Sequence, residues 1–370
     1  MRIGIDASPL AVEFGGIRRY TERLVHALAR VDDRNEYVLY APAECGRRPR
    51  IAPHVEWETS VLPLKLKGWL DLVHLPGSEG TIDLFHGTNY TAPLLARVPT
   101  VLTIHDLTVH LFPESHPRRR RLRHRLLPAL CRRSARIIAD SYCTKSDLVE
   151  HYGIPAEKID VVYLAAGEEF RPVGCMETLV RVRERYALPE TFVLFVGSVE
   201  PRKNLPQLVR AMATLIREGV EQRLVIAGDG PRRYMQSLRE LVRREGLELG
   251  TDVLLPGVVL DEDLPALYSL ADLFVYPSLY EGFGLPPLEA MACGAPVVLP
   301  DHSSFRELYR ECSLMLDLDR PDVLVNAMRR LLWDHALRDE FVERGQKLAK
   351  SRSWEDTALE TLEVYRRVTP

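Results

Sequence analysis

Residues Leu273–Gly294 read LFVYPSLYEGFGLPPLEAMACG and contain an apolar strand, a glycine loop and a helix in succession. The run LFVY predicts the strand. Pro286 and Pro287 predict the first turn of the helix, where a backbone N–H has no intrahelical partner to lose. Gly294 predicts the end of that helix. A strand that leads directly into a helix is the repeating unit of parallel α/β sheets, so this stretch predicts an α/β fold.

The same alternation of short apolar runs and helical patterns continues on both sides of this stretch. It predicts two doubly wound α/β domains of similar size that meet near the loop Ala165–Pro172. We therefore expect a first domain over residues 1–170 and a second over 171–353. Ligands bind beyond the carboxyl ends of the strands in such sheets, so a facing pair of domains is expected to hold its ligand in the cleft between them.

Strands and helices can be assigned individually from these patterns. The strands predicted in the first domain are Arg2–Ile5, Tyr37–Tyr40, Leu84–His86, Val101–His105, Arg136–Ala139 and Ile159–Val162. Those predicted in the second are Phe192–Val196, Leu224–Ala227, Val253–Leu255, Leu273–Tyr276 and Val297–Leu299. The predicted helices include Ile17–Ala29, Asn204–Glu218, Pro321–Trp333 and Trp354–Val368, the last with Ala358, Leu359, Leu362 and Tyr365 on one face.

The composition excludes several classes of protein. With 370 residues, 46% of them apolar and 27% charged, the chain has a globular composition and is too long for one ordinary core. A net charge of −3 gives no general reason for nucleic-acid binding. No run approaches the roughly 18 apolar residues of a membrane span. The six cysteines are widely spaced without a Cys-x-x-Cys pair, which favours a reduced cytoplasmic enzyme without structural zinc.

The glycine loop of the opening stretch predicts a phosphate site. Gly282 and Gly284 let backbone N–H groups approach an anion, and the following helix start favours negative charge. Glu281 and Glu289 flank this loop, and carboxylates accept hydrogen bonds from hydroxyls. The set suits a ligand with sugar or ribose hydroxyls on both sides of a phosphate. The pattern leaves open that Glu289 is only a helix-dipole partner and Glu281 a solvated loop acid.

Two further clusters follow predicted strands. Arg202 and Lys203 follow Phe192–Val196 and are placed to neutralise a diphosphate, although two solvated loop cations remain the alternative. In the first domain, Gly15 and Gly16 precede the first long helix, where a side chain would block a ligand. His105 and Asp106 end a strand on the same side as the expected cleft, but a structural histidine remains the alternative there.

Together these segments resemble the retaining glycosyltransferases of family 4, which have the two-domain GT-B fold. The resemblance covers most of the chain and rests on GGIRRYTERL, TIHDLTVHLFPESHP, FVGSVEPRKNL, LVIAGDGP, and above all Glu-x7-Glu within YPSLYEGFGLPPLEAMACG. It implies an acceptor-binding first domain, a nucleotide-sugar-binding second domain, and a C-terminal helix, 354–370, that returns to the first. The versions HDLTVHLFPESHP and EPRKN are similar to the mannosyltransferase-rich bacterial branch that makes surface polysaccharides and lipid-linked glycans.

The resemblance also implies a role for each site residue. Arg202 and Lys203 would hold the donor diphosphate, with the backbone of Phe283, Gly284 and Leu285. Glu289 would bind the ribose and Glu281 the donor sugar. Gly15 and Gly16 would make room for the diphosphate, and His105, with Asp106 beside it, would lie near the donor sugar and the acceptor. The expected catalytic residues are therefore His105, Asp106, Glu281 and Lys203. No metal is expected, and GDP-mannose is the favoured donor. Related lipid mannosyltransferases often carry Arg where this chain has Ser198.

Four other classes of protein compete with this one. A dinucleotide-binding oxidoreductase would use Gly282, Gly284 and Asp301, but Pro287 stands at the third glycine position. A metal-dependent glycosyltransferase would use Asp261–Asp263, which fits a helix N-terminus better. A non-catalytic scaffold would not need this full set of residues, and a sugar-nucleotide epimerase of the same fold stays open as the closer rival.

A basic run predicts a further surface. Between Ser115 and Ala139 the chain has no acidic residue and nine arginines, at positions 118, 119, 120, 121, 123, 125, 132, 133 and 136. Anionic lipid headgroups attract such a run by roughly 1 kcal/mol per basic residue. We expect it to attach the protein to the inner face of the plasma membrane, with an acceptor carried on a polyprenyl diphosphate. A solvated basic helix is the alternative, and nucleic acid is not expected because no aromatic residue interleaves the arginines.

Overall fold

The computed structural model describes residues 1–12, 15–42, 45, 51–60, 82–92, 98–318 and 320–369. The chain forms two compact units: unit 1 comprises Met1–Leu164 with Ser353–Pro370, and unit 2 comprises Ala165–Arg352. The chain therefore leaves unit 1 once, builds all of unit 2, and returns to unit 1 for its last helix. Pro370, the last residue of the expected C-terminal segment, lies outside the described residues.

Unit 1 is built on a parallel sheet. Its described residues form seven strands in the order β3-β2-β1-β4-β5-β6-β7, all pairs parallel. They are β1 Arg2–Asp6, β2 Glu36–Pro42, β3 Val55–Ser60, β4 Leu84–Gly87, β5 Thr100–Ile104, β6 Arg136–Ala139 and β7 Ile159–Val161. Strands β4 and β5 are buried throughout, as expected of central strands covered on both faces. The strand order reverses between β1 and β4, which marks the expected ligand position.

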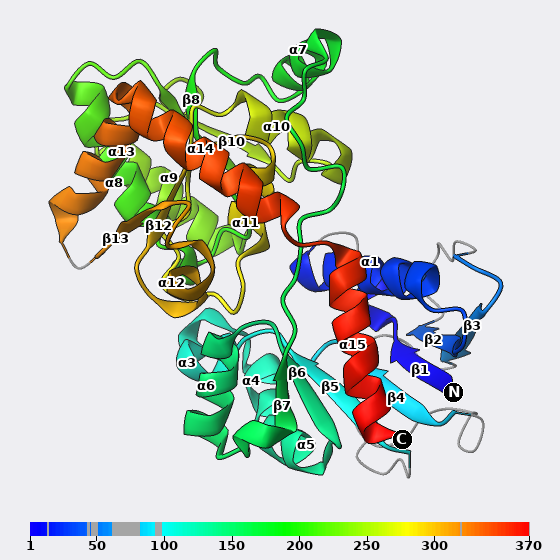
Figure 1. Ribbon diagram of the computed structural model, residues 1–370. Coiled ribbons are helices and arrows are strands. Elements are labelled where there is room, and N and C mark those ends of the chain that lie inside the picture. The colour runs from blue at the N-terminus through cyan, green and yellow to red at the C-terminus, as the bar shows by residue number, and fades with distance from the viewer. Residues whose placement is uncertain are drawn as a thin grey trace. The chain divides into compact units, whose positions relative to one another are not determined.

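Helices cover this sheet on both faces (Figure 1). They are α1 Gly16–Val31, α3 Thr108–Leu111, α4 Arg118–His124, α5 Leu127–Arg133, α6 Tyr142–Tyr152 and α15 Trp354–Val368, with the 3-10 turns η1 Ser8–Ala11, η2 Pro113–Ser115 and η3 Ala156–Lys158. Helix α1 buries Tyr20, Leu24 and Leu28 on one face, so its apolar residues recur at the period of a helix packed on a core.

The last helix, α15, packs along α1 within unit 1 (Figure 1). It begins with a capping box, in which Ser353 and Asp356 bind each other's backbone N–H groups through their side chains. The hydroxyl of Tyr365 lies 2.6 Å from Nδ1 of the buried His86. Leu359, predicted on the packed face, is instead 48% exposed, because it stands about 100° around the helix from the buried Ala358.

Unit 2 is built on a second parallel sheet. Its described residues form six strands in the order β10-β9-β8-β11-β12-β13. They are β8 Phe192–Val196, β9 Arg223–Ala227, β10 Val253–Gly257, β11 Leu273–Val275, β12 Val297–Pro300 and β13 Leu314–Leu316. This is the order of a Rossmann sheet, and it reverses between β8 and β11.

The helices of unit 2 precede, connect and follow these strands. They are α7 Met176–Arg185, α8 Leu205–Arg217, α9 Arg232–Arg244, α10 Leu264–Leu270, α11 Leu285–Ala292, α12 Ser303–Tyr309, α13 Pro321–Trp333 and α14 His335–Lys350, with the 3-10 turns η4 Pro201–Lys203 and η5 Asp261–Asp263. Between β11 and β12 the connection is the glycine loop and α11, as the opening stretch of sequence predicts.

The α/β class and the predicted strands and helices are confirmed, with shifts of one or two residues at their ends. Strands β3 and β13 were not predicted, and both stand at the edge of a sheet. β3, with the sequence VEWETS, carries polar residues between its apolar ones, and β13 has three residues. Among the described residues, no helix is long and apolar enough to cross a bilayer.

Candidate functional site

Unit 2 brings three predicted site residues to the point where its strand order reverses. The turn η4, after β8, carries Arg202 and Lys203. The loop after β11 carries Glu281 and leads into α11. Since β8 and β11 are adjacent parallel strands, both loops leave the sheet at the same edge. Ligands of Rossmann sheets bind at this edge.

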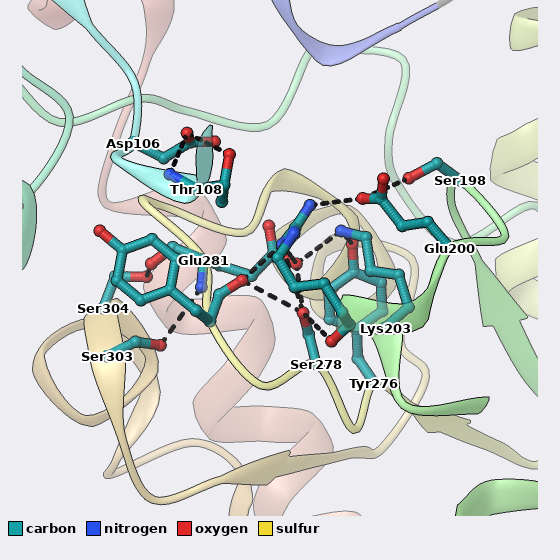
Figure 2. Close-up of polar contacts among 12 residues, drawn as sticks. Asp106, Thr108, Ser198, Glu200, Lys203, Tyr276, Ser278, Glu281, Ser303 and Ser304 are labelled. Atoms are coloured by element: carbon teal, nitrogen blue, oxygen red, sulfur yellow. Dashed lines mark hydrogen bonds and ion pairs between the residues drawn. The ribbon is translucent and has the colours of Figure 1, made fainter. Parts of the chain in front are cut away.

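One carboxylate oxygen of Glu281 links the other side chains of this cluster (Figure 2). Oε1 of Glu281 accepts hydrogen bonds from Arg202 Nη1 at 2.7 Å, from Lys203 Nζ at 2.5 Å and from the Ser278 hydroxyl at 2.6 Å. The other oxygen, Oε2, takes part in none of these three contacts. Glu281 therefore pairs with both cations and still has one carboxylate oxygen outside the cluster.

The three charged side chains are buried. Arg202, Lys203 and Glu281 are 7%, 4% and 9% exposed, so neither the solvated cations nor the solvated loop acid of the alternative interpretation is present. Burial favours the neutral carboxyl, but the charges of Arg202 and Lys203 outweigh it and hold the pKa of Glu281 below its usual value. Burial and the nearby Arg202 charge lower the pKa of Lys203. Glu281 is therefore ionised at neutral pH and can only accept hydrogen bonds.

An aromatic stack positions Lys203. Its Nζ donates to the Tyr276 hydroxyl at 2.7 Å and lies 4.8 Å from the centre of that ring. The Tyr276 ring stacks on Phe195 and on Phe274, with interplanar angles of 13° and 16°. These rings come from the ends of β8 and β11, so the sheet core itself fixes the position of the ammonium group.

A second carboxylate positions Arg202. Its Nη2 pairs with Oε1 of Glu200 at 2.7 Å, and the Ser198 hydroxyl lies 3.1 Å from the same oxygen (Figure 2). Arg202 Nη1 also donates to the carbonyl of Tyr280 at 2.5 Å. Ser198, which stands where related sequences often have Arg, thus orients a counter-ion of Arg202 in this chain.

The glycine loop before α11 is held by the conformation of Gly284 and by the Ser304 side chain of α12. Gly284 has φ of +89°, and a Cβ there would lie 2.7 Å from the Phe305 ring, so only glycine fits. The Ser304 hydroxyl donates to the carbonyls of Glu281 and Phe283, at 2.9 and 3.2 Å. No side chain caps α11. The backbone of Phe283, Gly284 and Leu285 thus stands at a helix start that favours an anion.

Glu289 takes a different position. It lies inside α11, is 1% exposed, and accepts a hydrogen bond at 3.0 Å from the hydroxyl of Tyr268. This burial does not exclude the helix-dipole role that the sequence left open for Glu289. The hydrogen bonds that join Glu281 to Arg202, Lys203 and Ser278 do not involve it.

In unit 1, His105 joins the ends of three neighbouring strands. Its Nδ1 lies 2.8 Å from Oδ2 of Asp140, which follows β6, and its Nε2 lies 2.9 Å from the carbonyl of Thr88, which follows β4. Burial disfavours the imidazolium, but the Asp140 carboxylate outweighs it, with help from the Thr88 carbonyl, and raises the pKa of His105. Both ring nitrogens of His105 are therefore engaged within unit 1.

The other predicted residues of unit 1 lie at loop and helix starts. Gly15 and Gly16 begin α1 and are exposed, and a Cβ at either position would have no described atom within 4 Å, so packing does not require glycine there. Gly15 has φ of +135°, which does favour glycine. The Asp106 carboxylate accepts from the N–H and the hydroxyl of Thr108, at 2.9 and 2.6 Å, and thereby holds the start of α3 (Figure 2).

The acidic triplet Asp261–Asp263 has a structural role. Asp263 is fully buried and pairs with Arg181 and Arg185 of α7, at 2.9 and 3.0 Å. Its turn, η5, leads directly into α10, as the helix-start interpretation expects. Among the described residues, no group of three metal-ligating side chains is assembled.

Sequence reasoning missed the partners that hold the site residues, chiefly Asp140, Thr88, Ser278 and Tyr276. Asp140 could have been found, because it directly follows an apolar strand as His105 does. The register pairs Ile104 with Ala139, so the residues after them, His105 and Asp140, come side by side. The contacts of Ser278 and Tyr276 depend on the path of a loop, which the sequence pattern does not specify.

Two parallel Rossmann-type units joined in this way have the arrangement of the GT-B fold that the sequence resemblance implies. The family description "Glycosyltransferase Family 4" matches residues 14–166, and "Glycosyl transferases group 1" matches residues 180–348. The chain is 34% identical over 287 residues to O-antigen chain mannosyltransferase B of Escherichia coli, with 76% of this chain and 74% of that protein covered. The chain belongs to the family 4 glycosyltransferases.

Solved structures share the fold. Sucrose-phosphate synthase from Thermosynechococcus elongatus has a TM-score of 0.79 at 22% identity, over 99% of this chain and 98% of that one. HepE of Anabaena, solved in complex with UDP-glucose, has a TM-score of 0.75 at 20% identity, over 99% of both chains. These similarities identify the GT-B fold of this chain.

Proposed function

We propose that this glycosyltransferase transfers mannose from GDP-mannose, with retention of configuration, to a glycan or lipid-linked acceptor in the synthesis of a surface polysaccharide or glycolipid. The observation that carries the proposal is the buried Arg202–Lys203–Glu281 cluster at the strand reversal of unit 2. The name of the Escherichia coli relative supports mannose as the transferred sugar. The HepE complex supports a nucleotide sugar as the donor class.

The cluster suits the departure of a nucleoside diphosphate. As the bond between the sugar C1 and the diphosphate oxygen breaks, negative charge grows on that oxygen. Arg202 and Lys203 stabilise this charge. Glu281 holds both cations in position before the donor binds, and Tyr276 also holds Lys203. Glu281 Oε2, which lies outside the cluster, is available to accept a hydrogen bond from a donor-sugar hydroxyl.

The protein offers no base at these positions for the acceptor hydroxyl. Glu281 is ion-paired with two cations, and both nitrogens of His105 are engaged with Asp140 and Thr88. We therefore assign the acceptor proton to the departing diphosphate, on the same face of the sugar. The acceptor oxygen bonds to C1 as the C1–diphosphate bond breaks, which retains the configuration. No metal is needed in this scheme, because Arg202, Lys203 and the start of α11 supply positive charge.

A thermal-shift screen against GDP, UDP and ADP sugars tests the donor. A ligand at 100 times its Kd should stabilise the protein by about 2.7 kcal/mol, and GDP-mannose should give the largest shift. Product analysis with labelled sugar nucleotide, with and without acceptor, separates transfer from epimerisation, and turnover should persist in EDTA. The proposal is wrong about the donor class if no nucleotide shifts the melting temperature.

The basic run supports a peripheral position on the inner face of the membrane. The exposed arginines of α4, α5 and their ends are Arg118, Arg119, Arg120, Arg121, Arg125, Arg132 and Arg133. Arg136, counted with them from the sequence, is half-buried and pairs with Asp160 through two hydrogen bonds. Leu127 and Leu130 are buried in the core, whereas Leu122 is 51% exposed among the arginines.

Vesicle co-sedimentation tests this position. Binding should require phosphatidylglycerol in phosphatidylcholine vesicles, weaken with salt, and drop when Arg118–Arg121 become Ser, because each basic residue near the surface contributes roughly 1 kcal/mol. An acceptor on a polyprenyl diphosphate is consistent with such a position. Equal binding to neutral vesicles, or binding to neither kind, would remove the membrane from the proposal.

A further inference from the structure

A hollow of about 690 Å³ opens in unit 1 among α3, α4, α5 and α6. Its volume falls within the range of small-molecule sites, roughly 300–1,000 Å³. The charged and titratable lining residues are Arg118, Arg121, Arg125, His110, His124 and His151. Among the described residues that line it, none is Asp or Glu. The charged side chains that line the hollow are therefore all basic, which favours an anion.

The arginines that line the hollow share one face of α4. Arg118, Arg121 and Arg125 are spaced three and four residues apart, so their side chains stand above one another on the helix. All three are exposed, and no hydrogen bond or ion pair to a described residue engages their side chains. Arg119, on the same helix and equally exposed, is not among the lining residues. Some arginines of the basic run therefore line the hollow, and others do not.

Histidine and tyrosine side chains also line the hollow. The rings of His110 and His151 have their centres 5.1 Å apart, and that of Tyr152 lies 5.4 Å from His110. The Tyr152 hydroxyl is 3.3 Å from Nδ1 of His124. Nε2 of His124 is buried without a hydrogen-bond partner among the described residues. The exposed His110 and His151 therefore offer imidazole groups that can donate to phosphate oxygens.

Apolar side chains complete the lining. Val109, Pro113, Leu122 and Pro128 border the hollow beside the arginines. An inorganic phosphate ion has no carbon atoms to pack against these apolar side chains, whereas the organic part of a phosphate ester does. The combination of guanidinium and apolar groups thus suits an organic phosphate.

The hollow also adjoins His105 within unit 1. The ring of Tyr90 lies 5.6 Å from the ring of His105 and 6.0 Å from the ring of His124, centre to centre. The Tyr90 hydroxyl lies 3.1 Å from the backbone N of Asp106. A single aromatic side chain therefore separates the hollow from the residues that the family resemblance places beside the acceptor.

We propose that this hollow binds the diphosphate of a diphosphate ester, with Arg118, Arg121 and Arg125 gripping the phosphates and the apolar wall contacting the ester. A diphosphate spreads its charge over two phosphate groups, so several guanidinium forks can bind it at once. The identity of the ester as the carrier of the acceptor sugar rests on the proposed function. Binding of the diphosphate itself stands on the hollow alone.

Titration calorimetry with inorganic pyrophosphate tests the site, with inorganic phosphate and geranyl diphosphate as comparison ligands. All proteins carry Lys203→Ala, so that the donor site of unit 2 contributes little. Arg121→Ser should weaken pyrophosphate binding by about tenfold to a hundredfold, the scale of one lost charge-assisted contact. The matched control, Arg119→Ser, removes the same charge from the same helix and should change binding by less than about twofold, because exposed charges outside the site are screened. Geranyl diphosphate should bind more tightly than pyrophosphate, and phosphate less tightly.

Each alternative result overturns the inference. Equal losses in Arg121→Ser and Arg119→Ser would show a diffuse basic surface, and absent pyrophosphate binding would show no site. Binding confined to phosphatidylglycerol vesicles, but sensitive to Arg121, would show a lipid-headgroup site instead. Sugar-nucleotide binding by the protein with native Lys203 is measured alongside. Its absence, with pyrophosphate still bound in the hollow, would refute the proposed function and leave this inference standing.

Discussion

Arg202 in unit 2 and Arg121 in unit 1 carry the same guanidinium group in opposite surroundings. Arg202 is 7% exposed and shares Glu281 with Lys203. Arg121 is exposed and has no carboxylate among the residues that line its hollow. A buried and paired cation is held in place before any ligand arrives, at the cost of desolvation. An unpaired, exposed cation costs little to maintain, but its attraction is open to screening by salt.

The largest effect is expected from a variant that removes the Glu281 carboxylate, the counter-ion shared by the buried Arg202 and Lys203. Glu281→Gln leaves Arg202 and Lys203 buried without their shared counter-ion, so we expect a loss of about 3–5 kcal/mol in the free energy of unfolding. Urea unfolding at neutral pH measures it. The control is Glu262→Gln, since Glu262 pairs loosely and at the surface with Arg185 at 3.8 Å. That variant should lose at most about 1 kcal/mol. Equal losses in the two variants would contradict the contrast.

The contribution of Glu281 to stability is expected to depend on pH. Because the pKa of Glu281 is lowered in the folded protein, its stabilisation is complete above the ordinary carboxyl pKa. It is lost as the pH falls through the lower, folded-state pKa. The difference in stability between the wild type and Glu281→Gln should therefore be constant near neutral pH and shrink below about pH 4. A difference that grows on acidification would show that Glu281 is protonated in the folded state.

The next largest effect concerns turnover. Lys203→Ala removes one charge-stabilising donor, so we expect turnover to fall by about 10²–10³. Lys347, an exposed residue of α14 in the same unit, supplies the matched control, and Lys347→Ala should keep full activity. Steady-state assays with a sugar nucleotide give both values. Full activity in Lys203→Ala would exclude Lys203 from the donor site.

The smallest expected effect is that of salt. Raising the ionic strength should weaken pyrophosphate binding in the hollow by roughly threefold to tenfold. Binding of the donor nucleotide should change by less than about twofold, because buried pairs are screened less. Titrations of the two ligands at two salt concentrations compare them directly. Equal salt dependence would mean that the two sets of cations are equally open to solvent.

Most of the fold could be predicted because central strands have a clear sequence pattern. Strands such as Phe192–Val196, buried on both faces, are continuous apolar runs. At the edge, β3 alternates polar and apolar residues, so it does not give that signal. Positions that follow a strand were predictable for the same reason, and Arg202, Lys203 and His105 were found in this way.

What surrounds those residues could not be predicted, because it depends on pairing between distant segments. The sequence does not show that Glu281 binds both cations through one oxygen, which depends on the path of the loop from Tyr276. Nor does it show that His105 lies between Thr88 and Asp140, which takes the register of three strands. The basic run was visible, but its division between hollow-lining and other arginines required the helix face.

The position of α15 has a consequence for the order of events during synthesis. The 188 residues of unit 2, from Ala165 to Arg352, separate the sheet of unit 1 from the helix that packs on α1. At about 5–20 residues per second, the ribosome needs roughly 10–40 s to make them. Throughout that time the surface of α1 that α15 covers is exposed, and His86 has no tyrosine hydroxyl at its Nδ1. The first part of the chain to leave the ribosome is therefore the last to complete its folding.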